Sequence, residues 1–368
     1  RLVRAYGGVP LSLSIENDDS QWDRARSSKE VIYAQIISDL ENAESRLWNK
    51  SETSGADMGR ATKGAAQAML MKVYMYMHEY AKAKEWGDKF LQDQAAEYSL
   101  APDFASNFTI AGENNEESIF EIQYANEATS DYGSGNGSTR GTFTQVLTRS
   151  RSTNMGDEGW GFNKPTHNLY NEYEEADSLR RDATIILLDS AHLGEQDTYL
   201  GTSYLNRKTG LYNADGTGYT YKNAHNTRGV LNNKQYRLAD FYLLYAEACL
   251  GIGDASTATI YLNKVRTRVG LPTYPGYTFK VNGEEITSPT LEEAIRHERR
   301  MELAMEGHRW FDLCRWGVAY EVMTAYMALE SSEAKAEMQP FKKGVHELLP
   351  IPNKQRQLNP SLTQNPGY

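Results

Sequence analysis

Apolar residues recur every three to four positions over long stretches of the chain, which predicts amphipathic helices. In residues 27–48 this stripe follows Ser27 and Glu30, whose spacing predicts a capping box at the start of a helix. Residues 60–93 and 236–268 each predict two helices with a tight turn between them. Each pair resembles a tetratricopeptide unit, although a simple solenoid needs about three such units.

The part of the chain between these helical pairs follows another pattern. At residues 119–124 apolar and polar side chains alternate, which predicts a strand. The sequence then becomes rich in Gly, Ser, Asn and Thr, and near residues 200–235 in Gly, Asn and Tyr, where irregular hairpins are expected. Further along, the pair Asn282 and Gly283 stands between two β-prone runs and predicts a tight hairpin.

These patterns predict one mainly α domain over residues 1–368. Its helical scaffold is expected at residues 27–100 and 236–330. Residues 119–235 are expected to form a loop-rich insert that carries the ligand site, because loops on a rigid scaffold are where binding residues concentrate. Residues 340–368 are rich in Pro and Asn and are expected to lie extended over the surface.

A helix with a strong start signal precedes the most charged stretch of the chain. Thr290 and Glu293 have capping-box spacing, so a helix is expected to begin there and to end at Gly307, a natural stop. The residues expected on its buried side are Leu291, Ile295, Met301, Leu303 and Ala304.

The charged side of this helix has two interpretations. Glu298, Arg299 and Glu302 stand at spacings that allow pairing along one helix. After the turn, arginines and an aspartate alternate with aromatic residues as far as Trp316. An ion-pair clamp between two helices is favoured over a catalytic carboxylate cluster, because each acid has an arginine within reach.

Composition narrows the classes of function. Of the 368 residues 40% are hydrophobic and 24% charged, as in an ordinary globular protein. The net charge of −10 argues against nucleic acid as a main partner, because phosphate binding needs a basic surface. The longest apolar runs fall short of the roughly 20 residues that cross a membrane. The two cysteines, Cys249 and Cys314, lie in apolar helical patterns and are expected in the core.

Several catalytic and metal-binding motifs are incomplete in the sequence. The pair His297 and Glu298 lacks the second histidine that a zinc-binding helix needs. Residues 133–141 lack the spacing of a phosphate loop, and residues 213–218 lack the glutamate that completes a calcium loop. Nothing selects one pair of carboxylates for glycoside hydrolysis. We therefore expect no catalytic residue, no metal and no cofactor.

Four separated motifs resemble a single protein family. RHERRMELAMEGHRWFDLCRWG resembles the signature of the SusD/RagB family, the surface nutrient-binding lipoproteins of Bacteroidetes, and LLPIPNKQRQLNPSLTQNPGY resembles its C-terminal tail. GRATKGAAQAMLMKVYMYMHEYAKAKEW and YRLADFYLLYAEA resemble its helical repeats, and RAYGGVPL resembles the point where its N-terminal helices end. The resemblance covers essentially the whole chain.

The resemblance implies a non-catalytic binding protein on a tetratricopeptide-like scaffold with long loops and small β-hairpins. Such a protein is lipid-anchored at the outer membrane, exposed at the cell surface, and delivers captured glycans to a SusC-type TonB-dependent transporter. Some members take peptides, so a peptide ligand stays open, as does a tetratricopeptide-type adaptor for protein partners. Members begin with a lipoprotein signal, a lipidated Cys and further helices, so this sequence is expected to lack an N-terminal part.

Ligand residues are expected in the loop-rich insert. Aromatic faces there can stack on sugar rings while polar side chains bind hydroxyl groups, and Tyr is abundant, with 24 copies against 10 Phe. Trp160 is the first candidate because it stands between two glycines with no helical stripe around it. The alternative is that Trp160 and Phe162 attach the loop to the scaffold. The candidate set is Trp160, Tyr132, Phe162, Asn136, Arg140 and Asp157.

Overall fold

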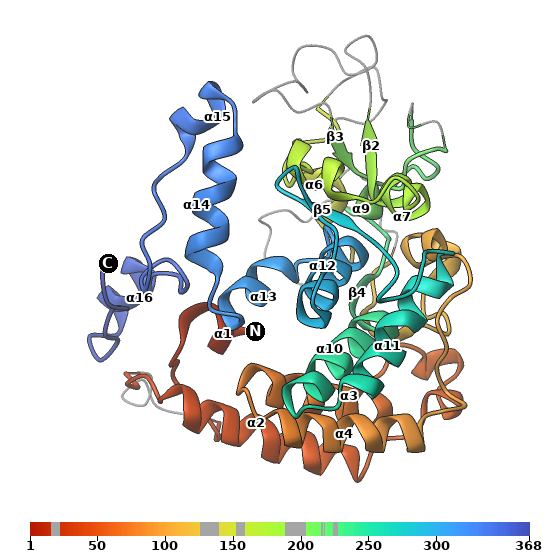
Figure 1. Ribbon diagram of the computed structural model, residues 1–368. Coiled ribbons are helices and arrows are strands. Elements are labelled where there is room, and N and C mark those ends of the chain that lie inside the picture. The colour runs from red at the N-terminus through yellow and green to blue at the C-terminus, as the bar shows by residue number, and fades with distance from the viewer. Residues whose placement is uncertain are drawn as a thin grey trace.

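Helices make up most of the described structure. A computed structural model of the protein describes residues 1–15, 23–125, 140–151, 159–187, 204–214, 216, 218–223 and 227–368. Within these ranges the strands form only two-stranded antiparallel sheets (Figure 1). The mainly α fold predicted from the sequence is thus confirmed. None of the helices in the described ranges has the length and apolarity that a membrane crossing requires.

The scaffold is a group of packed helices, most of which form a layer at one end of the molecule, with α12 above them at its centre (Figure 1). Its members are α2 (Lys29–Glu44), α3 (Lys63–Tyr76), α4 (Tyr80–Asp93), α10 (Leu238–Gly251), α11 (Ala255–Arg268) and α12 (Leu291–Leu303). Helix α3 packs on α4 and α10 packs on α11, as the two predicted pairs require, and α10 also contacts α4 and α12. Because α10 touches both pairs and α12, it is buried almost throughout and forms the centre of the core.

Gly87 lets α4 approach α10 closely. A methyl group at this position would lie 2.3 Å from Cδ2 of Tyr245, well inside contact distance. Gly87→Ala is therefore expected to lower the free energy of unfolding by about 1–3 kcal/mol, because it overpacks the core. Urea unfolding measures the change. Glu85→Ala, at an exposed position of the same helix, is the matched control and should stay within about 0.5 kcal/mol. Equal small effects for both variants would contradict the close approach.

Helix ends follow the sequence signals with two corrections. Thr290 and Glu293 form the predicted capping box at the start of α12. Helix α2 begins one residue later than predicted, because Ser28, not Ser27, accepts the hydrogen bond from the backbone of Val31. Helix α12 ends at Leu303 instead of Gly307, since the backbone at Ala304 is already extended.

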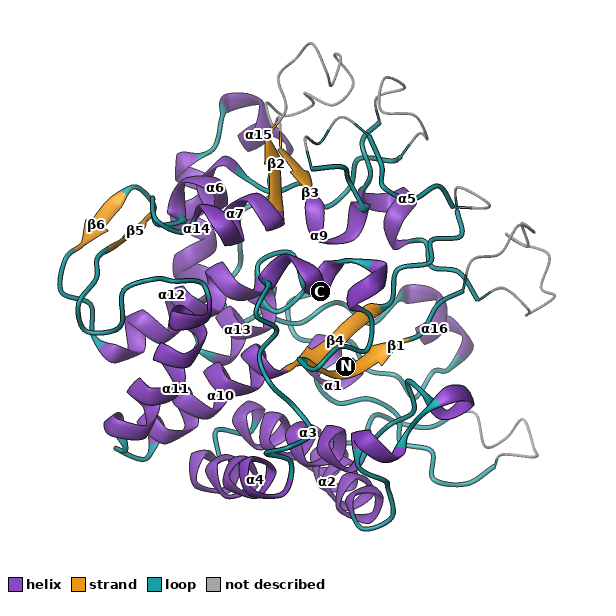
Figure 2. Ribbon diagram, turned by 90° about the vertical axis from the view of Figure 1, so that its right-hand side faces the viewer, coloured by secondary structure: helices purple, strands orange, loops and turns teal. Residues whose placement is uncertain are grey.

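Three short two-stranded ribbons occur in the described ranges, and one of them joins distant parts of the chain. They are β1 (Ser118–Ile122) with β4 (Asn233–Arg237), β2 (Ile185–Leu187) with β3 (Tyr204–Asn206), and β5 (Phe279–Val281) with β6 (Glu284–Ile286). The last is the hairpin predicted at Asn282 and Gly283, which both adopt positive φ as a tight turn requires. In the first, Ser118 lies opposite Arg237, and β4 leads directly into α10 (Figure 2). The two ends of the region 119–235 therefore meet beside the scaffold.

Short helices and extended chain make up the remainder. The insert contains α5 (Thr144–Thr148), α6 (His167–Glu172), α7 (Ser178–Thr184) and α9 (Arg207–Gly210). Outside it lie α1 (Leu2–Tyr6), α13 (Arg309–Arg315), α14 (Ala319–Leu329), α15 (Ser332–Glu337) and α16 (Asn353–Leu358). After Phe341 the C-terminal part is irregular apart from α16. The guanidinium of Arg26 donates to the backbone of Tyr6 and to Asn365, which fastens this tail to the first helix.

Candidate functional site

The segment at residues 159–162 of the insert is attached to α5 through backbone atoms. The N–H groups of Trp160 and Phe162 donate to the carbonyls of Val146 and Leu147, each at 2.7 Å. These carbonyls lie in the last turn of α5, where the helix itself supplies no partner. Gly161 adopts a positive φ of 67° between the two aromatic residues. The residue pattern Gly-Trp-Gly-Phe thus places two aromatic side chains beside a short helix.

Trp160, Phe162 and Phe143 form what we name the aromatic surface. Trp160 is 44% exposed and Phe162 57% exposed. The Trp160 and Phe162 rings stand edge to face with centroids 6.2 Å apart, and the Phe143 ring lies 6.4 Å from Trp160. Because the backbone attaches the loop, the side chains remain available at the surface. Contact with a ligand and attachment of the loop to the scaffold both stay predictions for these two rings.

The other candidates from the sequence do not all fall within the described structure. Tyr132, Asn136 and Asp157 lie outside the described residues. Arg140 is exposed, and its carbonyl accepts a hydrogen bond from the backbone of Ala125 at 3.0 Å. Of the six candidates, the structure therefore brings Trp160 and Phe162 into direct contact.

Two residues, one in the aromatic surface and one beside it, were not among the candidates. Phe143 precedes α5, and Arg228 faces its ring at 5.5 Å from a separate segment. Their positions depend on an isolated antiparallel bridge between Thr142 and Gly229, which joins segments far apart in the chain. Short-range sequence patterns give no signal for such a bridge, apart from the glycines that flank it.

Helix α5 also lines a cavity of about 690 Å³. Thr144, Gln145 and Thr148 of α5 line it, together with residues of β4 and of the turn after α12. Its apolar wall comes from α1, α2 and α3, through Leu2, Val3, Ile36, Met69 and Val73. Helix α5 thus borders both this cavity and the aromatic surface.

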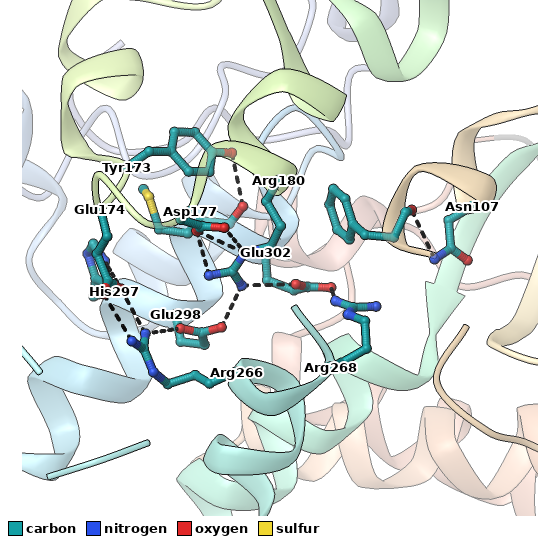
Figure 3. Close-up of polar contacts among 12 residues, drawn as sticks. Asn107, Tyr173, Glu174, Asp177, Arg180, Arg266, Arg268, His297, Glu298 and Glu302 are labelled. Carbon is teal, nitrogen blue, oxygen red and sulfur yellow. Dashed lines mark hydrogen bonds and ion pairs between the residues drawn. The ribbon is translucent and has the colours of Figure 1, made fainter. Parts of the chain in front are cut away.

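The charged stretch singled out in the sequence forms a buried network and no open site. The Glu302 carboxylate accepts hydrogen bonds from Arg180 and Arg268 (Figure 3). It also accepts one from Arg237, so its three partners come from three different segments. Glu298 pairs with Arg180 and with Arg266, the latter at 2.9 Å. The predicted pairing of these glutamates with Arg299 along one helix is therefore wrong, because arginines from outside α12 occupy both carboxylates.

Arg299 instead makes the predicted clamp between helices. Its guanidinium pairs with Asp312 of α13 at 3.0 Å and with Asp240 of α10 at 2.9 Å. Arg315 returns from the end of α13 to the same Asp312, also at 3.0 Å. Asp240 also pairs with Lys72 of α3, whose Nζ lies 2.6 Å from Oδ2 of the aspartate. Four helices are thus fastened by ion pairs that are almost completely buried.

The protonation states of the carboxylates in these networks fit a role in stabilising the fold better than a role in acid–base catalysis. Burial alone would raise the pKa of Glu302, but Arg268, Arg237 and Arg180 hold it well below the usual range. Burial likewise opposes ionisation of Glu306, yet Arg237 and Lys208 lower its pKa to about 2. Such carboxylates stay ionised and paired at neutral pH, whereas a general acid or base needs a pKa near the working pH. In the described ranges no group of three or more His, Cys, Asp or Glu is placed to hold a metal ion.

Comparisons with known proteins agree with this architecture. Residues 189–368 match the family described as "SusD family", and residues 1–75 match one described as "Starch-binding associating with outer membrane". The solved structure of a laminarin binding SusD-like protein is 30% identical, with a TM-score of 0.77, over all of this chain and 75% of its own. The chain belongs to the SusD family. The ion-paired stretch at residues 297–317 lies inside the matched region, so its charges support a family fold.

Other SusD-family relatives extend the comparison. A "SusD-like protein" of Bacteroides ovatus is 29% identical over 343 residues. That match covers 86% of this chain and 56% of the relative, so the chain spans a little over half of the relative's length. Surface glycan-binding protein A from Bacteroides thetaiotaomicron, solved in complex with laminarihexaose, is 25% identical with a TM-score of 0.74. The match covers 99% of this chain and 74% of that one.

Proposed function

We propose that this SusD-family chain belongs to a non-catalytic glycan-binding protein associated with the outer membrane. In this proposal the protein is lipid-anchored and exposed at the cell surface. It captures oligosaccharides or polysaccharides and delivers them to a SusC-type TonB-dependent transporter. The aromatic surface of Phe143, Trp160 and Phe162 stacks on sugar rings of the ligand.

The exposure of Trp160 and Phe162 is the observation that carries this proposal. These two rings lie next to each other at the surface, and flat apolar rings suit the apolar faces of sugar rings. The rings stand at 84° to one another, so they offer differently directed faces to a flexible chain. Their backbone is held by α5, which reduces the entropy that is lost when a ligand binds.

The relatives support a glycan as the ligand class. One similar structure is named for laminarin binding, and another was solved with laminarihexaose. The match of residues 1–75 to a family described as starch-binding and associating with the outer membrane supports the location. The engagement of Glu298, Glu302 and Glu306 by buried cations supports a role without catalysis.

Replacement of Trp160 by alanine tests the proposed surface. A glycan array first identifies the best ligand, and calorimetric titration then gives its Kd. Trp160→Ala is expected to weaken binding by about ten- to thirtyfold, because truncation of an aromatic anchor typically costs about 1.4–2 kcal/mol. The melting temperature should remain that of the unmodified protein, because the attachment to α5 uses backbone atoms.

Trp48 provides a matched control for this experiment. It is 54% exposed and lies outside the insert, so Trp48→Ala should leave glycan affinity unchanged. A loss of stability in Trp160→Ala that equals the loss of binding would instead identify Trp160 as a structural attachment. Binding of peptides without any glycan would show that the ligand class is wrong.

A further inference from the structure

Arg228 lies directly behind the aromatic surface. Thr142 and Gly229 exchange both backbone hydrogen bonds, at 2.8 and 2.7 Å, which places Phe143 opposite Arg228 across an antiparallel bridge. The guanidinium carbon of Arg228 lies 5.5 Å from the centre of the Phe143 ring. Gly141 makes this approach possible, because a methyl group there would come within 2.8 Å of the Arg228 backbone.

Arg228 is a buried cation without a counterion in the described structure. Only 3% of the residue is exposed, and its Nε has no hydrogen-bond partner. No carboxylate of the described residues lies within ion-pair distance of its guanidinium. By contrast, the buried Arg180 and Arg266 each pair with two or more carboxylates. Burying a charge without a partner costs several kcal/mol, so the unpaired state of Arg228 requires an explanation.

We propose that the ligand of the aromatic surface carries an oxyanion, either a uronate carboxylate or a sulfate group, which pairs with Arg228. This inference rests on the proposed glycan-binding function and narrows its ligand class to acidic glycans. The planar guanidinium can donate two parallel hydrogen bonds to such a group while a sugar ring stacks on Phe143 or Trp160. A neutral hydroxyl group would satisfy one donor but would leave the buried charge uncompensated.

Three probes distinguish the possible ligands. Oligogalacturonate supplies carboxylates, a sulfated galactan oligosaccharide supplies sulfates, and laminarihexaose is neutral. At least one acidic probe is expected to bind at least tenfold more tightly than laminarihexaose, and its affinity should fall as NaCl rises from 50 to 500 mM. The better acidic probe identifies the source of the oxyanion. Equal or tighter binding of laminarihexaose would overturn the inference and leave the proposed function intact.

Variants at Arg228 test the contact itself. Arg228→Met is expected to lower the affinity for the acidic probe at least tenfold. Arg228→Lys keeps the charge and should therefore retain part of that affinity. The melting temperature of Arg228→Met without ligand should stay the same or rise, because an unpaired buried charge is removed. A purely structural arginine would give a lower melting temperature and unchanged affinity, which would overturn the proposal.

Two outcomes remain to be separated. If Arg228→Met does not fold, the preference of the unmodified protein for acidic over neutral probes decides the question alone. If none of the three probes binds and the glycan array is also negative, the proposed function fails and this inference fails with it.

Discussion

Replacing Glu302 by glutamine is expected to lower the free energy of unfolding by about 3–5 kcal/mol, because it removes one partner of a buried ion-pair network. The carboxylate accepts hydrogen bonds from Arg180, Arg237 and Arg268, and none of its surface is exposed. Glutamine keeps the shape of the side chain but leaves these guanidinium groups with an uncompensated charge. Urea unfolding, followed by circular dichroism, measures the loss.

Glu292→Gln is the matched control for this variant. Glu292 lies on the same helix α12 and pairs with Arg296, but its side chain is 58% exposed. Exposed ion pairs of this kind contribute little to stability, so the free energy of unfolding is expected to change by no more than about 0.5 kcal/mol. If Glu302→Gln behaved like Glu292→Gln, the network would contribute little to stability and the charged stretch would need another explanation.

The protein is expected to lose stability in two stages as the pH falls. In the first stage, burial lowers the pKa of His308 from its ordinary 6.5 to about 4. The unfolded chain therefore takes up a proton between about pH 6.5 and 4 while the folded protein does not. Protonation then favours unfolding, and the cost of this stage is about 3 kcal/mol.

The second stage belongs to paired carboxylates. Burial opposes their ionisation, but Arg237 and Lys208 lower the pKa of Glu306 to about 2, and His297 and Arg266 do the same for Glu174. Both groups are charged and paired when folded, so their contribution is complete above about pH 4.5 and is lost as the pH falls towards 2. Each contributes about 3 kcal/mol, and together they approach the total stability of an ordinary domain.

Urea unfolding at a series of pH values measures both stages. His308→Gln should flatten the curve between pH 6.5 and 4 and leave the fall below pH 4.5 in place, whatever its effect on stability at pH 7. A curve for the unmodified protein that is flat from pH 6.5 to 4 would contradict the buried, neutral state of His308.

The parts of the fold that could be predicted from the sequence depend on neighbours along the chain. The capping box of Thr290 and Glu293 and the turn at Asn282 and Gly283 are both local, and both are confirmed. The two helical pairs follow from apolar spacing within single stretches. The start of α2 at Ser28 instead of Ser27 shows the limit of such patterns, because Ser28 caps the helix although only Ser27 has the capping-box spacing to Glu30.

The parts that could not be predicted depend on contacts between distant segments. The partners of Glu302 come from positions 180, 237 and 268, and no periodicity in the sequence connects them. Phe143 and Arg228 meet only because Thr142 and Gly229 form a bridge. The division into scaffold and insert, and the ligand roles of the candidate residues, stay predictions.

The attachment of residues 159–162 to α5 has a consequence for how ligand preference can change among related proteins. Every hydrogen bond that holds this segment to residues 146–150 joins backbone atoms. Substitution of Trp160 or Phe162 therefore leaves the segment in place, and the glycines that shape it can stay as they are. Under the proposed function, other side chains at these two positions would change the bound ligand without a penalty in folding.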